Sequence, residues 1–335
     1  MTISTAIPRG AVAIGLAFVA PIGTAVYAQP TSTGSGQAYP AKNIILVVPY
    51  PPGGGTDLFA RVIAHDLAKQ FDRQLVVDNR SGANGNIGAE LVAKAAPDGY
   101  TLLYTASPIA VSRVLSKVVR FDAQRDLRPI SMTISIPLVL AVHPSLPVRN
   151  VKELIALAKA KPGALTYSSS GPGASGHFTM ELLNFAGGID TRHVAYRGAA
   201  PALTSVLSGE TQMAFLVPPL VQPHIASGKL RVVAVSSRTR SPVLPNVPTV
   251  QEQGLRDFEA LQWHGFFAPA AVPDVIVKVL HGAVVKALAS PDVKSKLAAE
   301  GASVVGSSPA EFAAFFQKEL VKWTEIAKRA GIQPE

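Results

Sequence analysis

The chain has 335 residues, of which 48% are hydrophobic, and its formal net charge at pH 7 is +9. This length suggests two domains with large apolar cores. The chain has no cysteine, which excludes both disulfides and a lipid-anchored N-terminus. A basic chain suits nucleic acid, a membrane surface or anionic solutes, but no Lys–Arg cluster with interleaved aromatic residues occurs, so we expect no nucleic-acid partner.

The N-terminal segment predicts export. Residues 10–28 carry no charge and end with small residues, Val26 and Ala28, at the two positions that a signal peptidase reads. A membrane anchor is the rival interpretation, but the run is rich in alanine and glycine, is broken by a proline and lacks a charged stop flank. We therefore expect a signal peptide over residues 1–28 that is cleaved after Ala28, a flexible leader over residues 29–38, and a periplasmic location.

Strands and helices alternate through most of the remaining sequence, which favours α/β architecture with largely parallel sheets. A first series predicts strands at residues 44–48, 75–77 and 100–104 and helices at residues 57–71 and 86–95. A second series predicts strands at residues 165–168, 193–196, 213–217 and 231–235 and helices at residues 175–185, 199–207 and 220–226. Tail helices are expected at residues 273–288, 292–299 and 309–330.

The first strand leads into a glycine turn, Tyr50-Pro51-Pro52-Gly53-Gly54-Gly55. Glycine permits a tight turn and close approach of the backbone to another molecule, and Thr56 or Asp57 can cap the next helix. A strand, a glycine turn and a helix N-terminus together present free N–H groups and a positive dipole end, which hold anions. A tight turn without a ligand is the alternative. The apolar face predicted for this helix comprises Leu58, Val62, Ile63, Leu67 and Phe71.

A second glycine pattern, Ser81-Gly82-Ala83-Asn84-Gly85, follows the strand that ends at Asp78 and again precedes a helix. One such turn is ordinary. Two of them at the carboxyl ends of strands in one open sheet are typical of a ligand crevice.

A third loop contains Ser168, Ser169 and Ser170, followed by glycines that formally satisfy G-x-G-x-x-G. This pattern allows a dinucleotide site. However, Pro172 stiffens the turn where a pyrophosphate needs N–H groups, and Asp190 precedes the next strand instead of closing it. Three serines on a glycine turn suit a small carboxylate better, since it needs several short donors.

Serine and metal chemistry are further alternatives. His177 lies close to several hydroxyls, but there is no G-x-S-x-G elbow and no acid evidently placed to orient it. The seven histidines are scattered without H-E-x-x-H spacing, so we expect no metal. After a later strand, Arg197 either pairs with an anion or is a surface charge.

Two apolar extended segments, residues 136–143 and 261–268, lie between the two series. Two crossings imply that one lobe is assembled from both ends of the chain. We expect a first lobe from residues 39–140 with 264–335 and a second lobe from residues 141–263. Such a body can close on a ligand by hinge bending.

An ordered set of motifs resembles the tripartite tricarboxylate transporter substrate-binding proteins, also called the Bug family. The matching segments span essentially the whole chain after the leader: residues 47–57 with Ala60 and Arg61, then residues 79–88, 97–102, 195–198, 223–225, 245–249 and 267–269. Each segment is weak alone, but their ordered combination is specific.

The resemblance implies a periplasmic receptor with a two-lobed, type II-like binding-protein fold, its two mixed or parallel sheets joined by two crossing strands. Such a receptor delivers small carboxylates to the inner-membrane permease subunits of a tricarboxylate-type transporter. We expect it to be a monomer without catalytic residues, cofactor or metal. The expected ligand-binding residues are Tyr50, Pro52, Gly53, Gly54, Gly55, Thr56, Asp57, Ser81, Gly82, Ala83, Asn84, Ser107, Ser168, Ser169, Ser170, His177, Tyr196, Arg197, Gly198 and Val217.

This chain departs from the family where relatives often carry aspartates, at Ser205, Gln212 and Val217-Pro218. The missing acid removes a partner for an amino group, which favours a mono- or dicarboxylate without one, aromatic acids included. The alternatives are a hinge-closing enzyme acting on a small carboxylate, a nucleotide-dependent oxidoreductase and a structural envelope protein. The enzyme needs a nucleophile or acid–base pair at the cleft, and none can be assembled from the sequence.

Overall fold

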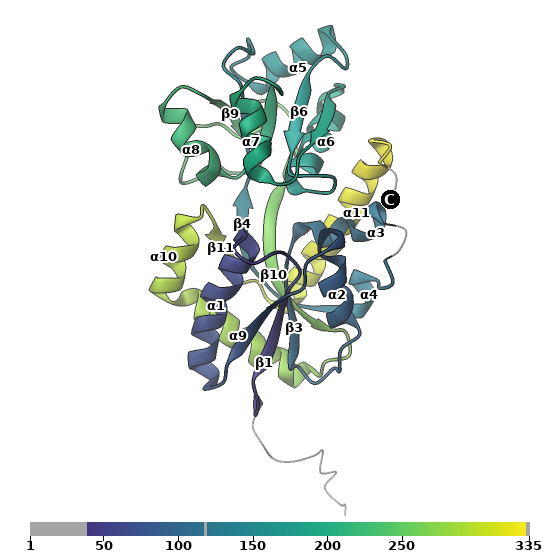
Figure 1. Ribbon diagram of the computed structural model, residues 1–335, viewed down its shortest axis with the longest axis vertical. Coiled ribbons are helices and arrows are strands. Elements are labelled where there is room, and N and C mark those ends of the chain that lie inside the picture. The colour runs from purple at the N-terminus through teal and green to yellow at the C-terminus, as the bar shows by residue number, and fades with distance from the viewer. Residues whose placement is uncertain (1–38, 117–118, 333–335) are drawn as a thin grey trace, which may run out of the picture. The chain divides into compact units, whose positions relative to one another are not determined.

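The computed structural model describes residues 39–116 and 119–332. The expected signal peptide and leader lie outside these residues. Within them, strands and helices alternate, and two mixed sheets form, which confirms the α/β prediction (Figure 1). In this described part, no helix combines the length and the apolar character that crossing a membrane requires.

The first sheet has six strands in the order β11-β4-β10-β3-β1-β2. Their bounds are β1 (Ile44–Val48), β2 (Leu75–Asn79), β3 (Thr101–Ala106), β4 (Leu127–Pro137), β10 (Leu261–Pro269) and β11 (Ser303–Val304). β1 pairs in parallel with β2 and β3, so the carboxyl ends of these three strands meet at one edge of the sheet. β10 runs antiparallel to both β3 and β4.

Helices cover both faces of this sheet. Figure 1 shows α1 (Gly55–Phe71), α9 (Asp274–Ala289) and α10 (Pro291–Ala299) on one side, where they share one apolar core. The other core is shared by η2 (Ser107–Val111), α2 (Asn86–Ala93), α3 (Ser112–Leu115), α4 (Ala123–Asp126) and α11 (Pro309–Arg329). A short helix, η1 (Ala83–Gly85), precedes α2.

The buried face of α1 differs from the predicted one. Phe59, Ile63 and Leu67 are buried, at the i, i+4 spacing of one helix face, whereas Leu58 is 40% exposed. The prediction shifted the start of the face by one residue because Leu58 and Phe59 are both large and apolar.

The second sheet has five strands in the order β7-β6-β8-β5-β9. Its strands are β5 (Val139–Val142), β6 (Thr166–Ser169), β7 (Arg192–Ala195), β8 (Met213–Leu216) and β9 (Arg231–Val235). Its helices are α5 (Val151–Ala160), α6 (Ser175–Gly187), α7 (Ala199–Leu207) and α8 (Pro218–Ala226). β6 is parallel to β7 and β8, and β5 is antiparallel to β8 and β9.

The two sheets share one layout. Each has three parallel strands in the order second, first, third, and beside the third runs an antiparallel strand, β10 in one sheet and β5 in the other. The chain leaves the first sheet at Pro137 and enters the second at Val139. It returns at Leu261. Val139 and Leu140 therefore pair within the second sheet, two residues before the expected lobe boundary, because the apolar run at the crossing is continuous and nothing in it marks the change.

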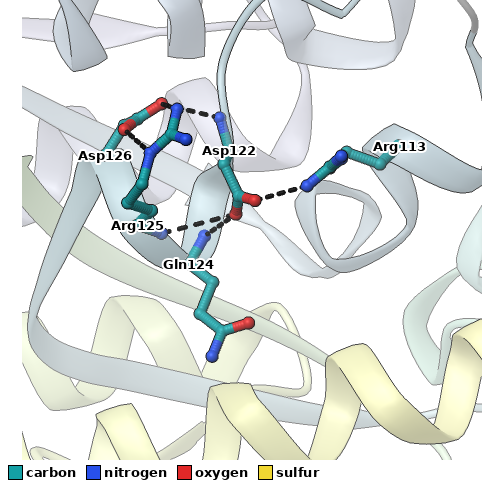
Figure 2. A network of polar contacts seen from close by, with 5 residues as sticks. All are labelled: Arg113, Asp122, Gln124, Arg125 and Asp126. Carbon is teal, nitrogen blue, oxygen red and sulfur yellow. Dashed lines mark hydrogen bonds and ion pairs between the residues drawn. The ribbon is translucent and has the colours of Figure 1, made fainter.

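A polar network links α3 to α4 (Figure 2). Asp122 caps α4 by accepting from the backbone N–H groups of Gln124 and Arg125, and its other carboxylate oxygen contacts Arg113. Arg125 donates to both oxygens of Asp126 at 2.7 and 3.0 Å. Each charge in this network has an opposite partner, so we interpret it as a structural tie between the two short helices.

Candidate functional site

Three loops meet at the carboxyl edge of β1, β2 and β3. They are residues 49–54, residues 80–85 and the start of η2 at Ser107. Val48 pairs with Asn79 in the parallel ladder, so the first two loops leave the sheet side by side. All the candidates that were expected from the first half of the chain lie on these loops or on the first turn of α1.

Asp57 holds the glycine loop in shape. Its carboxylate accepts from Gly53 N at 2.9 Å, from Asn79 Nδ2 at 2.9 Å and from Arg61 Nε at 3.0 and 2.9 Å. Asn79 Nδ2 also donates to the Tyr50 carbonyl oxygen at 3.1 Å. Asp57 is therefore not the helix cap, because Gly54 occupies that position without any side-chain cap. Its carboxylate is occupied within the protein.

The pKa of Asp57 agrees with this set of hydrogen bonds. Burial disfavours the charged form of Asp57, but the hydrogen bonds from Arg61, Gly53 and Asn79 outweigh it and hold the pKa of this carboxyl below its ordinary value. Asp57 is therefore ionised and neutralised locally by Arg61. The outer part of the loop, from Pro51 to Gly55, is exposed.

Glycine is required at three places in these loops, because Gly53, Gly82 and Gly85 all have a positive φ. Gly53 has φ +79°, which side chains rarely adopt, whereas Gly54 has φ −77°, which suits any residue. Gly85 has φ +93°, and a Cβ there would lie 3.3 Å from the Tyr50 hydroxyl oxygen. Tyr50 is thus packed under the second loop. Burial raises the pKa of Tyr50 to about 12, and among the described residues no hydrogen-bond partner is found for its buried hydroxyl.

A matching set of loops follows β6, β7 and β8 in the second sheet. Ser168 Oγ donates to the Ala202 carbonyl oxygen at 2.8 Å, and Ser169 Oγ lies 2.6 Å from His193 Nε2. Both serines are buried, and Ser170 is exposed. Of the three expected serine donors, only Ser170 keeps its hydroxyl available to solvent.

The Ser169–His193 contact has the spacing of a nucleophile and its base, but other features argue against that chemistry. Ser169 is 1% exposed, and its oxygen also accepts from Gly171 N at 3.2 Å. In the described part of the chain, no carboxylate hydrogen bonds to His193 to orient it. The pair therefore organises the loop, since its oxygen cannot be reached by a substrate.

His177 has a similar supporting role. Its Nδ1 accepts from Gly173 N at 3.2 Å, and its ring stacks on His193 with centroids 3.9 Å apart. Burial lowers the pKa of His177 to about 3, and that of His193 to about 4, so both rings are neutral at neutral pH. The N–H groups of Gly171 and Gly173, which a pyrophosphate would need, are thus already used within the loop. This removes the basis for a dinucleotide site.

The remaining candidates border the same edge. Tyr196 N donates to the Ser169 carbonyl oxygen at 3.0 Å, and Gly198, with φ +122°, precedes the first turn of α7. Arg197 is exposed, and among the described residues no ion pair to it is found. Arg80, by contrast, pairs with Asp78 at 2.9 Å. Val217 precedes α8 and packs against the cores of both sheets.

The two sets of loops touch each other. Asn84 Nδ2 donates to the Pro172 carbonyl oxygen at 3.3 Å, and Ser107 Oγ lies 3.0 Å from Ser175 Oγ. Beside this contact is a small hollow of about 20 Å³, lined in part by Ser107, Ser175, Phe178 and Trp323. Of the expected ligand residues, only Ser107 lines it. Trp323 could not be found from the sequence, because it lies in a tail helix without recognisable motifs.

Several helices begin at the candidate site. α1, α6, α7 and α8 begin directly after these loops, and none has a side-chain cap, a feature shared with α9 and α10. α5 and α11 are capped by Asn150 and Ser308. Uncapped helix N-termini attract anions through their N–H groups and dipole. Within the described residues, no group of three or more His, Asp or Glu side chains is placed to hold a metal.

Comparison with known proteins agrees with the family resemblance seen in the sequence. A family model described as "Tripartite tricarboxylate transporter family receptor" matches residues 59–332. BugT of Bordetella pertussis is 36% identical over 312 residues, which cover 92% of this chain and 95% of BugT.

Solved structures are similar as well. R. palustris Rpa4515 with adipate has a TM-score of 0.76 at 34% identity, covering 89% of this chain and 100% of that one. The periplasmic binding protein BugD has a TM-score of 0.73 at 30% identity, covering 89% and 100%. MatC from Rhodopseudomonas palustris with bound malate has a TM-score of 0.73 at 29% identity, covering 86% and 99%.

Proposed function

Since this chain belongs to the tripartite tricarboxylate transporter receptor family, also called the Bug family, we propose that it binds a small carboxylate between the strand-end loops of its two sheets and delivers it to an inner-membrane permease of the tricarboxylate type. Members of this family are periplasmic solute-binding receptors and not enzymes. The observation that carries the proposal is the contact between the two sets of loops, through Asn84 with Pro172 and Ser107 with Ser175.

Two lines support a carboxylate ligand. The loops present backbone N–H groups, the exposed hydroxyl of Ser170 and the uncapped N-termini of four helices, which together suit an anion. Two related structures contain dicarboxylates, adipate in Rpa4515 and malate in MatC. The exposed guanidinium of Arg197, for which no ion pair is found among the described residues, is a further candidate partner for a second carboxylate.

The ligand that fits best lacks an amino group. An ammonium needs a carboxylate or carbonyl partner, but Asp57 is already neutralised by Arg61 and fully engaged with Gly53 and Asn79. Val217, at the start of α8, offers only an apolar side chain. We therefore favour a mono- or dicarboxylate, aromatic acids included, over an amino acid.

Binding in this account takes place between two lobes. We assign residues 39–140 with 264–335 to one lobe and residues 141–263 to the other. The passage of the chain between the two sheets, from β4 to β5 and later into β10, supports this division. Two connections permit hinge closure over the ligand. A hinge-closing enzyme on the same architecture is the second candidate, but the Ser169–His193 pair that would serve it is buried.

Export completes the proposal: residues 1–28 are removed after Ala28, and the protein acts as a monomer in the periplasm. Mass spectrometry of small molecules released from freshly purified protein tests the function directly. We expect a small carboxylate without an amino group, and no turnover of that compound on prolonged incubation. Release of a nucleotide, or conversion of the carboxylate to a product, would contradict the proposal.

A further inference from the structure

His264 lies in the middle of the first sheet, in β10, and its side chain is completely buried. Its Nε2 is 3.1 Å from Oγ1 of Thr56, in the first turn of α1. Its Nδ1 is buried and has no hydrogen-bond partner among the described residues. The ring packs between Tyr104, stacked at 6.0 Å, and Phe59, edge-on at 5.0 Å.

The neighbouring strand holds this histidine in place independently of Thr56. Where β10 pairs with β4, His264 lies opposite Ile134 and Gly265 opposite Met132, so Thr133 is an extra residue in a bulge. Thr133 Oγ1 donates to the His264 carbonyl oxygen at 3.1 Å and lies 3.0 Å from the Tyr104 hydroxyl. The backbone of His264 is thus fixed by Thr133, and its ring is fixed by Tyr104 and Phe59 next to the first turn of α1.

The position of the ring proton follows from this geometry. Burial lowers the pKa of His264 to about 3, so the ring is neutral and has one N–H and one lone pair. If Nδ1 carried the proton, a buried N–H would lack an acceptor; if Nε2 carries it, only a lone pair is unused. Buried donors without partners are the rarer case in proteins. The Nε2–H tautomer is therefore favoured, and Nε2 donates to Thr56 Oγ1.

We propose that His264 is a positioning residue that occupies Thr56 Oγ1 as an acceptor and so leaves the Thr56 hydroxyl proton free to donate to the bound carboxylate. His264 is the only hydrogen-bond partner found for this hydroxyl among the described residues. In the opposite tautomer, Thr56 would donate to Nε2 and present only lone pairs, which repel an anion. The inference rests on the proposed function for its ligand, whereas the tautomer does not depend on it.

The tautomer is measured first, without ligand, by ¹⁵N NMR of the protein with labelled histidine. We expect the His264 resonances of a neutral ring with the proton on Nε2, unchanged between pH 8 and pH 5. A proton on Nδ1, or titration of this ring in that range, overturns the inference. This result stands whether or not a carboxylate binds.

The donor role is measured by calorimetry with adipate and malate. Thr56→Val, which keeps the shape but removes the hydroxyl, is expected to weaken binding about tenfold, and Thr56→Ser to restore most of the affinity. His264→Gln retains an N–H donor and is expected to bind better than His264→Leu. The double variant of Thr56→Val with His264→Leu should bind no worse than Thr56→Val alone, because both act through one hydroxyl.

The control is His281→Gln, because His281 also has a buried ring nitrogen without a partner but lies in α9, away from these loops. We expect it to bind like the wild type. Unchanged affinity in Thr56→Val overturns the donor role, even if His264→Leu fails to fold. Wild-type protein that binds no carboxylate contradicts the proposed function instead, and the NMR result then decides the tautomer alone.

Discussion

At the scale of single residues, Asp57 shows how one buried carboxylate sets the shape of a loop in the candidate site. It joins the glycine loop, β2 and α1 through Gly53, Asn79 and Arg61. Asp57→Asn replaces one acceptor oxygen by an NH₂ group, which then faces another hydrogen-bond donor. We expect the free energy of unfolding, measured by thermal or urea unfolding, to fall by about 1.5–3 kcal/mol. We also expect weaker ligand binding in a calorimetric titration.

The matched control is Asp66→Asn in the same helix; within the described part of the chain, the one hydrogen bond found to this carboxylate comes from Gln70 Nε2 at 3.0 Å. This change should alter stability by less than about 0.5 kcal/mol. Equal effects of the two substitutions would show that the Asp57 network does not stabilise the loop.

The buried histidines predict a dependence of stability on pH. The pKa values of His177, His193 and His264 are lowered to about 3, 4 and 3 by burial, whereas an unfolded histidine titrates near about 6.5. Below pH 6.5 the unfolded state therefore binds more protons, so stability is fully present above that pH and falls as the pH drops toward 4. Each histidine contributes a slope of up to about 1.4 kcal/mol per pH unit.

His177→Asn tests this dependence, because its side-chain oxygen can accept from Gly173 N but does not titrate. The decline in stability between pH 7 and pH 5, measured by urea unfolding, should become less steep, with the difference in slope approaching about one proton, or about 1.4 kcal/mol per pH unit, near pH 5. The same slope in wild type and variant would mean that His177 is protonated in the folded protein.

At the scale of elements, two glycines in the loop before α1 allow the effect of backbone strain to be measured separately from the effect of ligand contact. Gly53 has φ +79° and Gly54 has φ −77°, and a Cβ on Gly54 meets only the Pro51 oxygen at 3.5 Å. We expect Gly53→Val to lower both the melting temperature and the affinity. Gly54→Val should leave the melting temperature unchanged and weaken carboxylate binding. Full affinity in Gly54→Val would remove this loop from the site.

Most elements could be predicted from the sequence, because strands such as β1 and β9 are short apolar runs bounded by turns. α5 was missed, although Asn150 caps it and Glu153 completes an N-terminal signal. Most of β4 was missed too, since it is nearly all buried and shows no period of two.

The site was less predictable, for a different reason. The loops that form it were recognisable from their glycines, but the partners that occupy their side chains are distant in sequence. Ser168 donates to Ala202, and Thr56 is bonded to His264, 208 residues away. No local pattern reveals such pairs, so the sequence could not tell which serine or threonine hydroxyls remain available.

At the scale of the whole molecule, the repeated layout of the two sheets explains why the chain needs two crossings. In each sheet three parallel strands end in loops. The antiparallel strand beside them, β10 or β5, is the one with which the chain enters that sheet from the other sheet. Loops from both sheets then meet at Asn84 with Pro172 and at Ser107 with Ser175. Under the proposed function, a ligand held there would contact both halves of the protein, and these contacts would favour the closed state.

The most direct test of this account is calorimetric titration with two pairs of ligands that differ only by an amino group. Malate is compared with aspartate, and adipate with 2-aminoadipate. We predict that at least one of the two dicarboxylates without an amino group binds in about the micromolar range, and that its amino counterpart binds at least about tenfold more weakly. Equal or tighter binding of the amino compounds would contradict the assignment of ligand class.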